Sequence, residues 1–202
     1  MFNLWRLPWM SQVSRLKSGA SKREVENFYD VTASSYDRLY GEEQREKYSE
    51  AFRLLGNLKL SGVALDAGCG TGLLFERLEA FREIVAVDIS RRMLSEARVK
   101  ACRRQVHLVR CDIERLPFRG KVFDFCSAFT VLQNLPNPEE ALRELERVSS
   151  PKAVLAVTLM EGSERLPSPE EAFRLLRLKE AKLSKVRREL LLVGLKEFSF
   201  QR

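Results

Sequence analysis

The chain has 202 residues, of which 45% are hydrophobic and 31% are charged, and its formal net charge is +7. This length and composition predict one globular domain with a sizeable core. No apolar run approaches the roughly 18 residues that a membrane-spanning helix needs, so no membrane span is expected.

Residues 1–20 precede the first clear helical pattern and are interpreted as an N-terminal extension. The apolar run before Arg6 has five residues, which is shorter than the core of about 7–15 residues in a signal peptide. The mixture of aromatic and basic side chains leaves two interpretations open. One is an amphipathic surface helix, and the other is a disordered or packed extension.

Residues 21–56 are predicted to be helical and to fold over the rest of the domain as a lid. Ser21 and Glu24 have the spacing of a capping box, which marks a helix start. The stretch GEEQREKYSEAFRLLGNL is rich in helix-forming residues and ends near Gly56. The cofactor-binding core is expected over residues 62–202, in a single domain with the lid.

A strand and a glycine-rich turn follow in the stretch VALDAGCGTG. Its glycines Gly68, Gly70 and Gly72 let the backbone approach a nucleotide ligand closely. A dinucleotide-binding turn would instead place its third glycine at Leu73. The carboxylate of Asp66 would repel a pyrophosphate but suits a ligand that carries an ammonium and a sulfonium, which is S-adenosylmethionine.

Strands and helices alternate from the glycine turn to about residue 160. The pattern predicts helices over 71–81, 90–104 and 136–148, and strands over 83–90, 105–112, 121–132 and 152–160. Pro138 is expected in the first turn of its helix. This alternation predicts a parallel sheet that helices cover on both faces.

The tail begins with a predicted helix in SPEEAFRLLRLK, residues 168–179. The rest of the tail could extend this helix, or it could form two strands around Gly194. The alternation of EFSF, residues 197–200, favours two strands.

Two acids close predicted strands and are candidates for nucleotide contacts. Asp88 lies 18 residues after Gly70, where a carboxylate can accept hydrogen bonds from ribose hydroxyls. Asp88 could instead cap the next helix, although Ser90 already has that position. Asp112 closes the third strand and could accept the adenine amino group, with turn formation as the alternative.

The motifs LDAGCGTG, VAVDIS, CDIERLPF and FDFCSAFTVLQNL occur in the order and spacing of a known family. Residues 28–160 resemble a class I S-adenosylmethionine-dependent methyltransferase, in the methyltransferase-domain-11 or ubiquinone/menaquinone-methyltransferase-like group. The stretch FYDVTASSYDRLY resembles the segment that often precedes the glycine motif there. The resemblance implies a three-layer αβα Rossmann-like fold with a seven-stranded, mostly parallel sheet and a reversed C-terminal hairpin.

The resemblance also implies which residues contact S-adenosylmethionine. In the family, the residue at Tyr36 often lies against the methionine end of the cofactor, although a helix-packing role is the alternative. Ile89 and Ile113 would enclose the adenine ring. The implied cofactor contacts are Asp66, Ala67, Gly68, Cys69, Gly70, Asp88, Ile89, Met93, Asp112, Ile113, Phe129 and Tyr36.

No catalytic base is assigned, because an in-line methyl transfer to a neutral amine or a thiolate needs none. Gln133 and Asn134 follow the fourth strand and are candidates to orient a substrate, with loop hydrogen bonding as the alternative. Many relatives have a histidine where this chain has Asn134. The [ND]-P-P-[YF] signature of amide methylation is absent from this position. His107, the single histidine, is interpreted as a strand-edge or packing residue.

The cysteines and the charge bear on location and partners. None of the four cysteines forms a C-x-x-C pair, so no metal site is expected and a reduced, cytoplasmic protein is the simpler interpretation. Residues 91–121 contain ten Lys or Arg and three acidic residues. The difference of +7 equals the net charge of the whole chain. This segment favours RNA or a ribosomal partner, with a solvated helix face as the alternative.

The third strand should lie at the sheet edge, where QVHLVRC offers an unpaired apolar face. Some relatives that modify tRNA, rRNA or translation factors are activated by a small zinc-binding subunit on that edge, and the resemblance implies such a partner here. The oligomeric state stays open.

Three functional interpretations follow. The first is a methyltransferase, acting on a translation-related RNA or protein or, as the alternative, on a small molecule such as a quinone. The second is a non-catalytic cofactor-binding module. The third is a nicotinamide oxidoreductase, which the glycine spacing disfavours.

Overall fold

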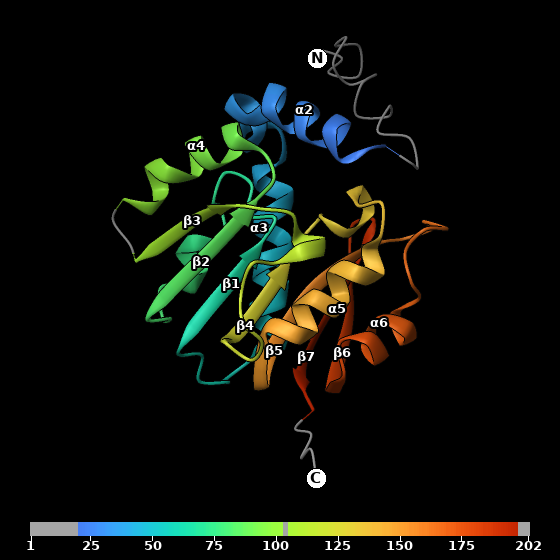
Figure 1. Cartoon of the computed structure of the whole chain (residues 1–202). Coiled ribbons are helices and arrows are strands. Elements are labelled where there is room, and N and C mark those ends of the chain that lie inside the picture. The colour runs from blue at the N-terminus through green and yellow to red at the C-terminus, as the bar shows by residue number, and fades with distance from the viewer. Residues whose placement is uncertain (1–19, 103–104, 198–202) are drawn as a thin grey trace, which may run out of the picture.

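A seven-stranded sheet runs through the middle of the computed structural model, which describes residues 20–102 and 105–197 (Figure 1). The strand order is β3-β2-β1-β4-β5-β7-β6, and the strands from β3 to β5 are parallel. β7 pairs antiparallel with both β5 and β6, which confirms the reversed C-terminal hairpin. The strands are β1 (Val63–Ala67), β2 (Glu83–Asp88), β3 (Val106–Arg110), β4 (Phe123–Ala128), β5 (Ser149–Met160), β6 (Leu178–Val186) and β7 (Glu189–Lys196).

Helices cover both faces of this sheet, as the alternating pattern predicted. α3 (Tyr36–Leu55) and α4 (Arg91–Ala101) contribute buried side chains to one core cluster, which contains Ala51 and Ala97. α5 (Pro138–Val148) and α6 (Pro169–Leu175) contribute to the cluster on the other face. Removing this apolar surface from water is the main stabilising contribution to the fold.

α2 (Lys22–Thr32) lies differently, across the carboxyl ends of the strands at the top of Figure 1. Ser21 and Glu24 form the predicted capping box at its start. A short 3-10 turn, Ala33–Ser35, leads directly into α3. Within the predicted lid, α2 and the first turns of α3 lie at this end of the sheet, whereas the rest of α3 packs on the sheet face through residues such as Tyr48 and Leu55.

The predicted helix over residues 71–81 is wrong. Turns and one 3-10 turn, Phe75–Leu78, connect β1 to β2 instead. Leu73, Leu74 and Phe75 are consecutive and all buried. An α-helix would turn one of three consecutive side chains away from the core, whereas a tighter irregular turn buries all three.

The two final strands are confirmed, but the turn between them is not at Gly194. The chain reverses at Arg187 and Arg188, and Gly194 lies within β7. A Cβ atom on Gly194 would lie 3.2 Å from the Cα atom of Ala181, where β6 is irregular. The glycine therefore serves close strand packing rather than a reversal.

Three sets of predictions lie outside the described residues. They are the extension before residue 20, Arg103 and Arg104 of the basic segment, and most of the EFSF strand from residue 198 onward. Among the helices of the described residues, none is long and apolar enough to cross a membrane. The cytoplasmic location stays a prediction.

Candidate functional site

A hollow opens at the carboxyl ends of β1, β2, β3 and β4, beneath α2. This is where the strand order reverses between β1 and β4, the usual ligand position in an open α/β sheet. Counted with its open mouth, the hollow measures about 700 Å³. It is lined by ten of the residues that the sequence singled out: Tyr36, Gly68, Gly70, Asp88, Ile89, Met93, Asp112, Ile113, Phe129 and Asn134.

Asp88 forms the polar wall of the hollow at the end of β2. Its Oδ2 accepts the backbone N–H of Gly70 at 2.9 Å, and its Oδ1 accepts the N–H of Ser90 at 2.8 Å. Burial raises the pKa of Asp88 to about 6, and these two hydrogen bonds oppose the rise. The Ser90 hydroxyl caps α4, as predicted, so the carboxylate of Asp88 keeps acceptor capacity toward the hollow.

Asp66 lies beneath the hollow rather than on its surface. Its Oδ1 accepts the hydroxyl of Ser127 at 3.0 Å, while its buried Oδ2 has no hydrogen-bond partner. Burial raises the pKa of Asp66 to about 7, and the negative charge of Asp88 adds to the rise. A buried carboxylate with an unpaired oxygen is costly, and a cationic group nearby would lower that cost.

The glycine turn fits tightly against the loop after β4. Gly68 has a φ of +77°, and a Cβ atom there would lie 2.2 Å from Cγ2 of Val131. Cys69 and Ala67 are buried and do not line the hollow. The backbone of the turn, rather than its side chains, therefore faces the space where a ligand would lie.

Asp112 already has a partner across the mouth of the hollow. Lys22, in the first turn of α2, forms ion pairs with Asp112 and with Glu114. Asp112 also accepts the backbone N–H of Glu114 at 3.0 Å, so it makes the turn that was the alternative interpretation. Oδ1 of Asp112 forms this turn and Oδ2 is the oxygen that pairs with Lys22, while the residue also lines the hollow.

Sequence reasoning missed the contribution of α2 to this site. Lys22, Val25 and Tyr29 line the hollow, although only Tyr36 was singled out in this segment. Burial raises the pKa values of Tyr29 and Tyr36, so both phenols are neutral hydrogen-bonding groups. A signal existed in the sequence, because the four tyrosines of the chain all lie between residues 29 and 48.

A second hollow adjoins the first and shares Tyr29, Tyr36, Thr130 and Asn134 with it. The side chain of Gln133 lines only this second space, where its Oε1 is buried without a hydrogen-bond partner. The two candidate substrate-orienting residues are thus brought together. The other residues that line the second hollow are Phe28, Tyr40, Glu43, Gln44, Met160, Ser163, Arg165 and Glu189.

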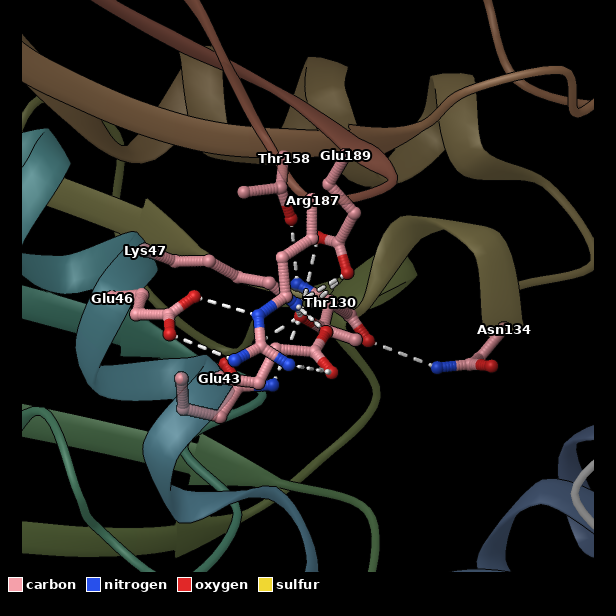
Figure 2. Close-up of polar contacts among 9 residues, drawn as sticks. Glu43, Glu46, Lys47, Thr130, Asn134, Thr158, Arg187 and Glu189 are labelled. Carbon is pink, nitrogen blue, oxygen red and sulfur yellow. Dashed lines mark hydrogen bonds and ion pairs between the residues drawn. The ribbon is translucent and has the colours of Figure 1, made fainter. Parts of the chain in front are cut away.

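A buried polar cluster lies behind Thr130 in this second hollow (Figure 2). The side chain of Lys47 has no exposed surface, and its Nζ lies 2.5 Å from Oε1 of Glu189 and 2.8 Å from the hydroxyl of Thr130. Nothing in the helical pattern of α3 distinguished Lys47 from its solvated neighbours. Its partners come from β7 and from the loop after β4, which sequence spacing does not reveal.

The thiols and the histidine stay outside the chemistry of the site. Burial raises the pKa values of Cys69 and Cys126, and it raises the pKa of Cys111 to about 11. These thiols are therefore not activated as nucleophiles. His107 is exposed on β3, with Nε2 3.5 Å from Glu83, as the strand-edge interpretation expected.

The sheet order, the glycine turn after β1 and the carboxylate at the end of β2 define a Rossmann-like fold of the methyltransferase type. Residues 65–157 match the profile of a methyltransferase domain family. This match identifies a class I S-adenosylmethionine-dependent methyltransferase domain in the chain, as its motifs implied.

Curated relatives agree with this family. Over 167 residues the chain is 28% identical to a demethylmenaquinone methyltransferase of Staphylococcus haemolyticus, which covers 79% of this chain and 70% of that protein. Over 151 residues it is 37% identical to a malonyl-[acyl-carrier protein] O-methyltransferase of Erwinia pyrifoliae, which covers 71% of this chain and 54% of that protein. The chain thus spans about half the length of some curated relatives that it matches.

Solved structures share the fold at low identity. One comes from the Haloferax volcanii complex between the Trm112 methyltransferase activator and a candidate methyltransferase. It has a TM-score of 0.70 and 17% identity, and the match covers 84% of this chain and 97% of that chain. Another is the magnesium protoporphyrin IX methyltransferase of Synechocystis with bound S-adenosylhomocysteine. Its TM-score is 0.68 at 19% identity, and the match covers 88% of this chain and all of that chain.

Proposed function

We propose that the chain binds S-adenosylmethionine in the first hollow and catalyses transfer of its methyl group to a small molecule. The observation that carries this proposal is Asp88, a half-buried carboxylate that two backbone amides hold at the wall of a glycine-lined hollow. When bound, S-adenosylmethionine supplies a methyl group that its sulfonium already activates as an electrophile.

The residues of the hollow suit this cofactor chemically. The unpaired Oδ2 of Asp66 and the carboxylate of Asp88 favour a ligand with positive charge and hydroxyl groups. Ile89 and Ile113 offer apolar contact to a purine ring, and Asp112 offers an acceptor for its amino group. The other proposed contacts are Tyr36, Ala67, Gly68, Cys69, Gly70, Met93 and Phe129.

The buried side chains that do not line the hollow have a different proposed role. Ala67 and Cys69 act through their backbone, because their side chains are buried. Asp66 acts through its charge from beneath the turn. Alignment of the acceptor with the methyl group and exclusion of water are the main contributions that the protein makes to such a transfer, and alignment alone can lower a barrier by about 7–11 kcal/mol.

The second hollow supports a small-molecule acceptor. It is walled by the rings of Phe28, Tyr29, Tyr36 and Tyr40 and shares its inner wall with the proposed cofactor site. The substrate names of the curated relatives, demethylmenaquinone and malonyl-[acyl-carrier protein], support the same alternative. Sequence analysis favoured a translation-related macromolecule, and the relatives favour the small molecule better.

An activator subunit on β3 remains a secondary proposal. β3 is the edge strand of the sheet, and within the described residues no strand pairs with its outer side. The structural likeness to a chain from a Trm112 complex supports a partner of this kind, which would bind zinc itself. The exposed basic residues of 91–121, such as Arg91 and Arg98, keep RNA or a ribosomal partner as an outcome to test.

Two measurements test the proposed function. Calorimetry should detect uptake of S-adenosylhomocysteine by the full chain and no uptake of NADH. Transfer of a radiolabelled methyl group should then be followed into the small-molecule, RNA and protein fractions of a cell extract. Label in the small-molecule fraction supports the proposal. Label only in RNA or protein would overturn the choice of acceptor, and no uptake of S-adenosylhomocysteine would overturn the proposal as a whole.

A further inference from the structure

Every polar group of Thr130 has a hydrogen-bond partner, and all of these partners except Asn134 come from another part of the fold (Figure 2). Its backbone N–H donates to the hydroxyl of Thr158 on β5 at 2.7 Å. Its hydroxyl accepts from Nζ of Lys47 at 2.8 Å and lies 3.1 Å from Oε1 of Glu189. Its carbonyl oxygen accepts from Nδ2 of Asn134 at 3.0 Å. The residue therefore connects the buried cluster to the loop that contains Gln133 and Asn134.

Thr130 has an unfavourable backbone conformation. Its φ is +59°, in the left-handed region that a β-branched residue rarely adopts. Such a conformation persists only where the surrounding contacts determine it, and it recurs at functional sites. Here the contacts come from Gln44, Lys47, Glu189 and Thr158. Thr130 also lines both hollows.

Burying the Lys47–Glu189 ion pair has a large desolvation cost. Lys47 is fully buried and Glu189 is 1% exposed. Burying two charges costs desolvation that their attraction often only offsets, and apolar residues of similar size are often as stable. Stability alone therefore gives no reason for this pair, whereas its hydrogen bonds to Thr130 do.

We propose that Lys47 and Glu189 are positioning residues, which hold Thr130 in its left-handed conformation and thereby fix Asn134 and the acceptor-facing loop, residues 129–135. Asn134 also donates to the hydroxyl of Tyr29 on α2 at 2.9 Å, so the fixed loop connects to the cover of the site. This inference rests on the proposed function. It adds that acceptor alignment depends on the charge of Lys47, which lines neither hollow, and on its pairing with Glu189, which lines the second hollow beside Thr130.

The contact between α3 and the β6–β7 hairpin also provides a matched control. Arg187 precedes Glu189 by two residues and pairs with Glu46, next to Lys47, at 2.6 Å. This second pair also links α3 to the β6–β7 hairpin, but both side chains are exposed, and Figure 2 draws no contact between either of them and Thr130. Removing this second pair weakens the contact between the same two elements without removing a hydrogen bond of the loop.

The test compares three forms of the full chain. The network variant Lys47→Met/Glu189→Leu removes both buried charges together. Glu43, which also pairs with Lys47 at 2.7 Å, has a side chain 34% exposed to solvent, so no unpaired buried charge is left to unfold the protein. The control variant is Glu46→Gln/Arg187→Gln. Thr130→Val keeps the β-branched shape and removes the hydroxyl, which provides a second variant if the network variant fails to fold.

The first measurement is hydrogen exchange of residues 129–135 with S-adenosylhomocysteine present. We expect exchange of this segment to rise about tenfold in the network variant and in Thr130→Val, because buried hydrogen bonds that close it are lost. We expect wild-type exchange in the control. Unchanged exchange in the network variant and in Thr130→Val would overturn the inference.

The second measurement separates positioning from general loosening. With the acceptor that methyl transfer identifies, kcat should fall about 100-fold in the network variant, as misplacement by about 1 Å can cause, while the dissociation constant for S-adenosylhomocysteine changes less than about twofold. Equal losses in the network and control variants would contradict a positioning role. Wild-type protein that does not take up S-adenosylhomocysteine would instead refute the proposed function, so the two failures are distinguishable.

Discussion

Lys22 and Asp112 form an ion pair that joins the first turn of α2 to the end of β3, across the mouth of the cofactor hollow. The pair involves the same carboxylate that we propose as the acceptor for the adenine amino group. Desolvation, which lowers the pKa of Lys22, is outweighed by hydrogen bonds and charge attraction from Asp112 and Glu114, so the pKa is raised. Lys22 is therefore cationic at neutral pH and holds α2 in place.

The first prediction concerns this contact. Lys22→Ala should raise both the association and the dissociation rate constants of S-adenosylhomocysteine about two- to fivefold, because a partly exposed ion pair contributes about 0.2–1 kcal/mol. Stopped-flow binding measures both constants. Arg23→Ala, an exposed neighbour on the same turn, should leave them unchanged. Slower binding in Lys22→Ala would contradict the view that this contact restrains entry.

The second prediction concerns Asp88. Asp88→Asn should weaken S-adenosylhomocysteine binding about 10- to 100-fold, since a charged acceptor for two ribose hydroxyls is worth about 1.5–3 kcal/mol. Calorimetry of folded protein measures the loss. Asp124→Asn is the control, because Asp124 likewise accepts a backbone N–H, from Val63 at 3.0 Å, but does not line the hollow. Equal affinities of the two variants would refute the proposed role.

The third prediction concerns pH. Burial raises the pKa of Asp66 to about 7 and that of Asp88 to about 6, so the folded protein binds more protons than the unfolded chain between about pH 4 and pH 7. Their contribution to stability is therefore present below pH 4 and is lost as pH rises through 6 and 7. Thermal melts should show a steeper fall in stability over this range for the wild type than for Asp66→Asn.

Cofactor binding should have the opposite pH dependence. A cationic, hydroxyl-bearing ligand favours the ionised carboxylates, so affinity for S-adenosylmethionine should increase from pH 5 to pH 8. Calorimetry at several pH values checks this. An affinity that is flat across this range would show that neither Asp66 nor Asp88 changes its protonation on binding.

The fourth prediction concerns the glycine turn. Gly68→Ala should abolish S-adenosylhomocysteine binding, because its Cβ atom would overlap Val131 in addition to straining the backbone. Gly162→Ala has a comparable positive φ of +74° with nothing within 4 Å of the added Cβ. It should cost about 1–2 kcal/mol of stability and leave binding intact. Denaturant unfolding and calorimetry separate the two effects.

Much of the fold was predictable because local patterns and tertiary contacts agree. Ser21 and Ser90 cap helices where the sequence indicated, and Asp88 and Asp112 follow strands whose carboxyl ends meet at one edge of a parallel sheet. The turns that replace the predicted helix over 71–81 were not predictable from propensity, because consecutive apolar residues pack better in a tight turn than on one helix face.

The polar contacts around the site were less predictable. Lys22 contacts Asp112 at a separation of 90 residues, and Lys47 contacts Glu189 at a separation of 142 residues. Each lysine has the appearance of a solvated helix residue until the sheet order is known. Charge patterns report neighbours along a helix, whereas these partners are set by strand order and by the hairpin turn.

All four tyrosines of the chain lie on the two helical segments beside the hollows, at Tyr29, Tyr36, Tyr40 and Tyr48. Incorporating fluorotyrosine would therefore place three fluorine nuclei, at Tyr29, Tyr36 and Tyr40, in the walls of the second hollow, and the fourth, at Tyr48, in the adjoining core. A one-dimensional fluorine NMR spectrum with four resonances could then be used to screen metabolite libraries directly. A candidate acceptor would be recognised because it shifts particular resonances.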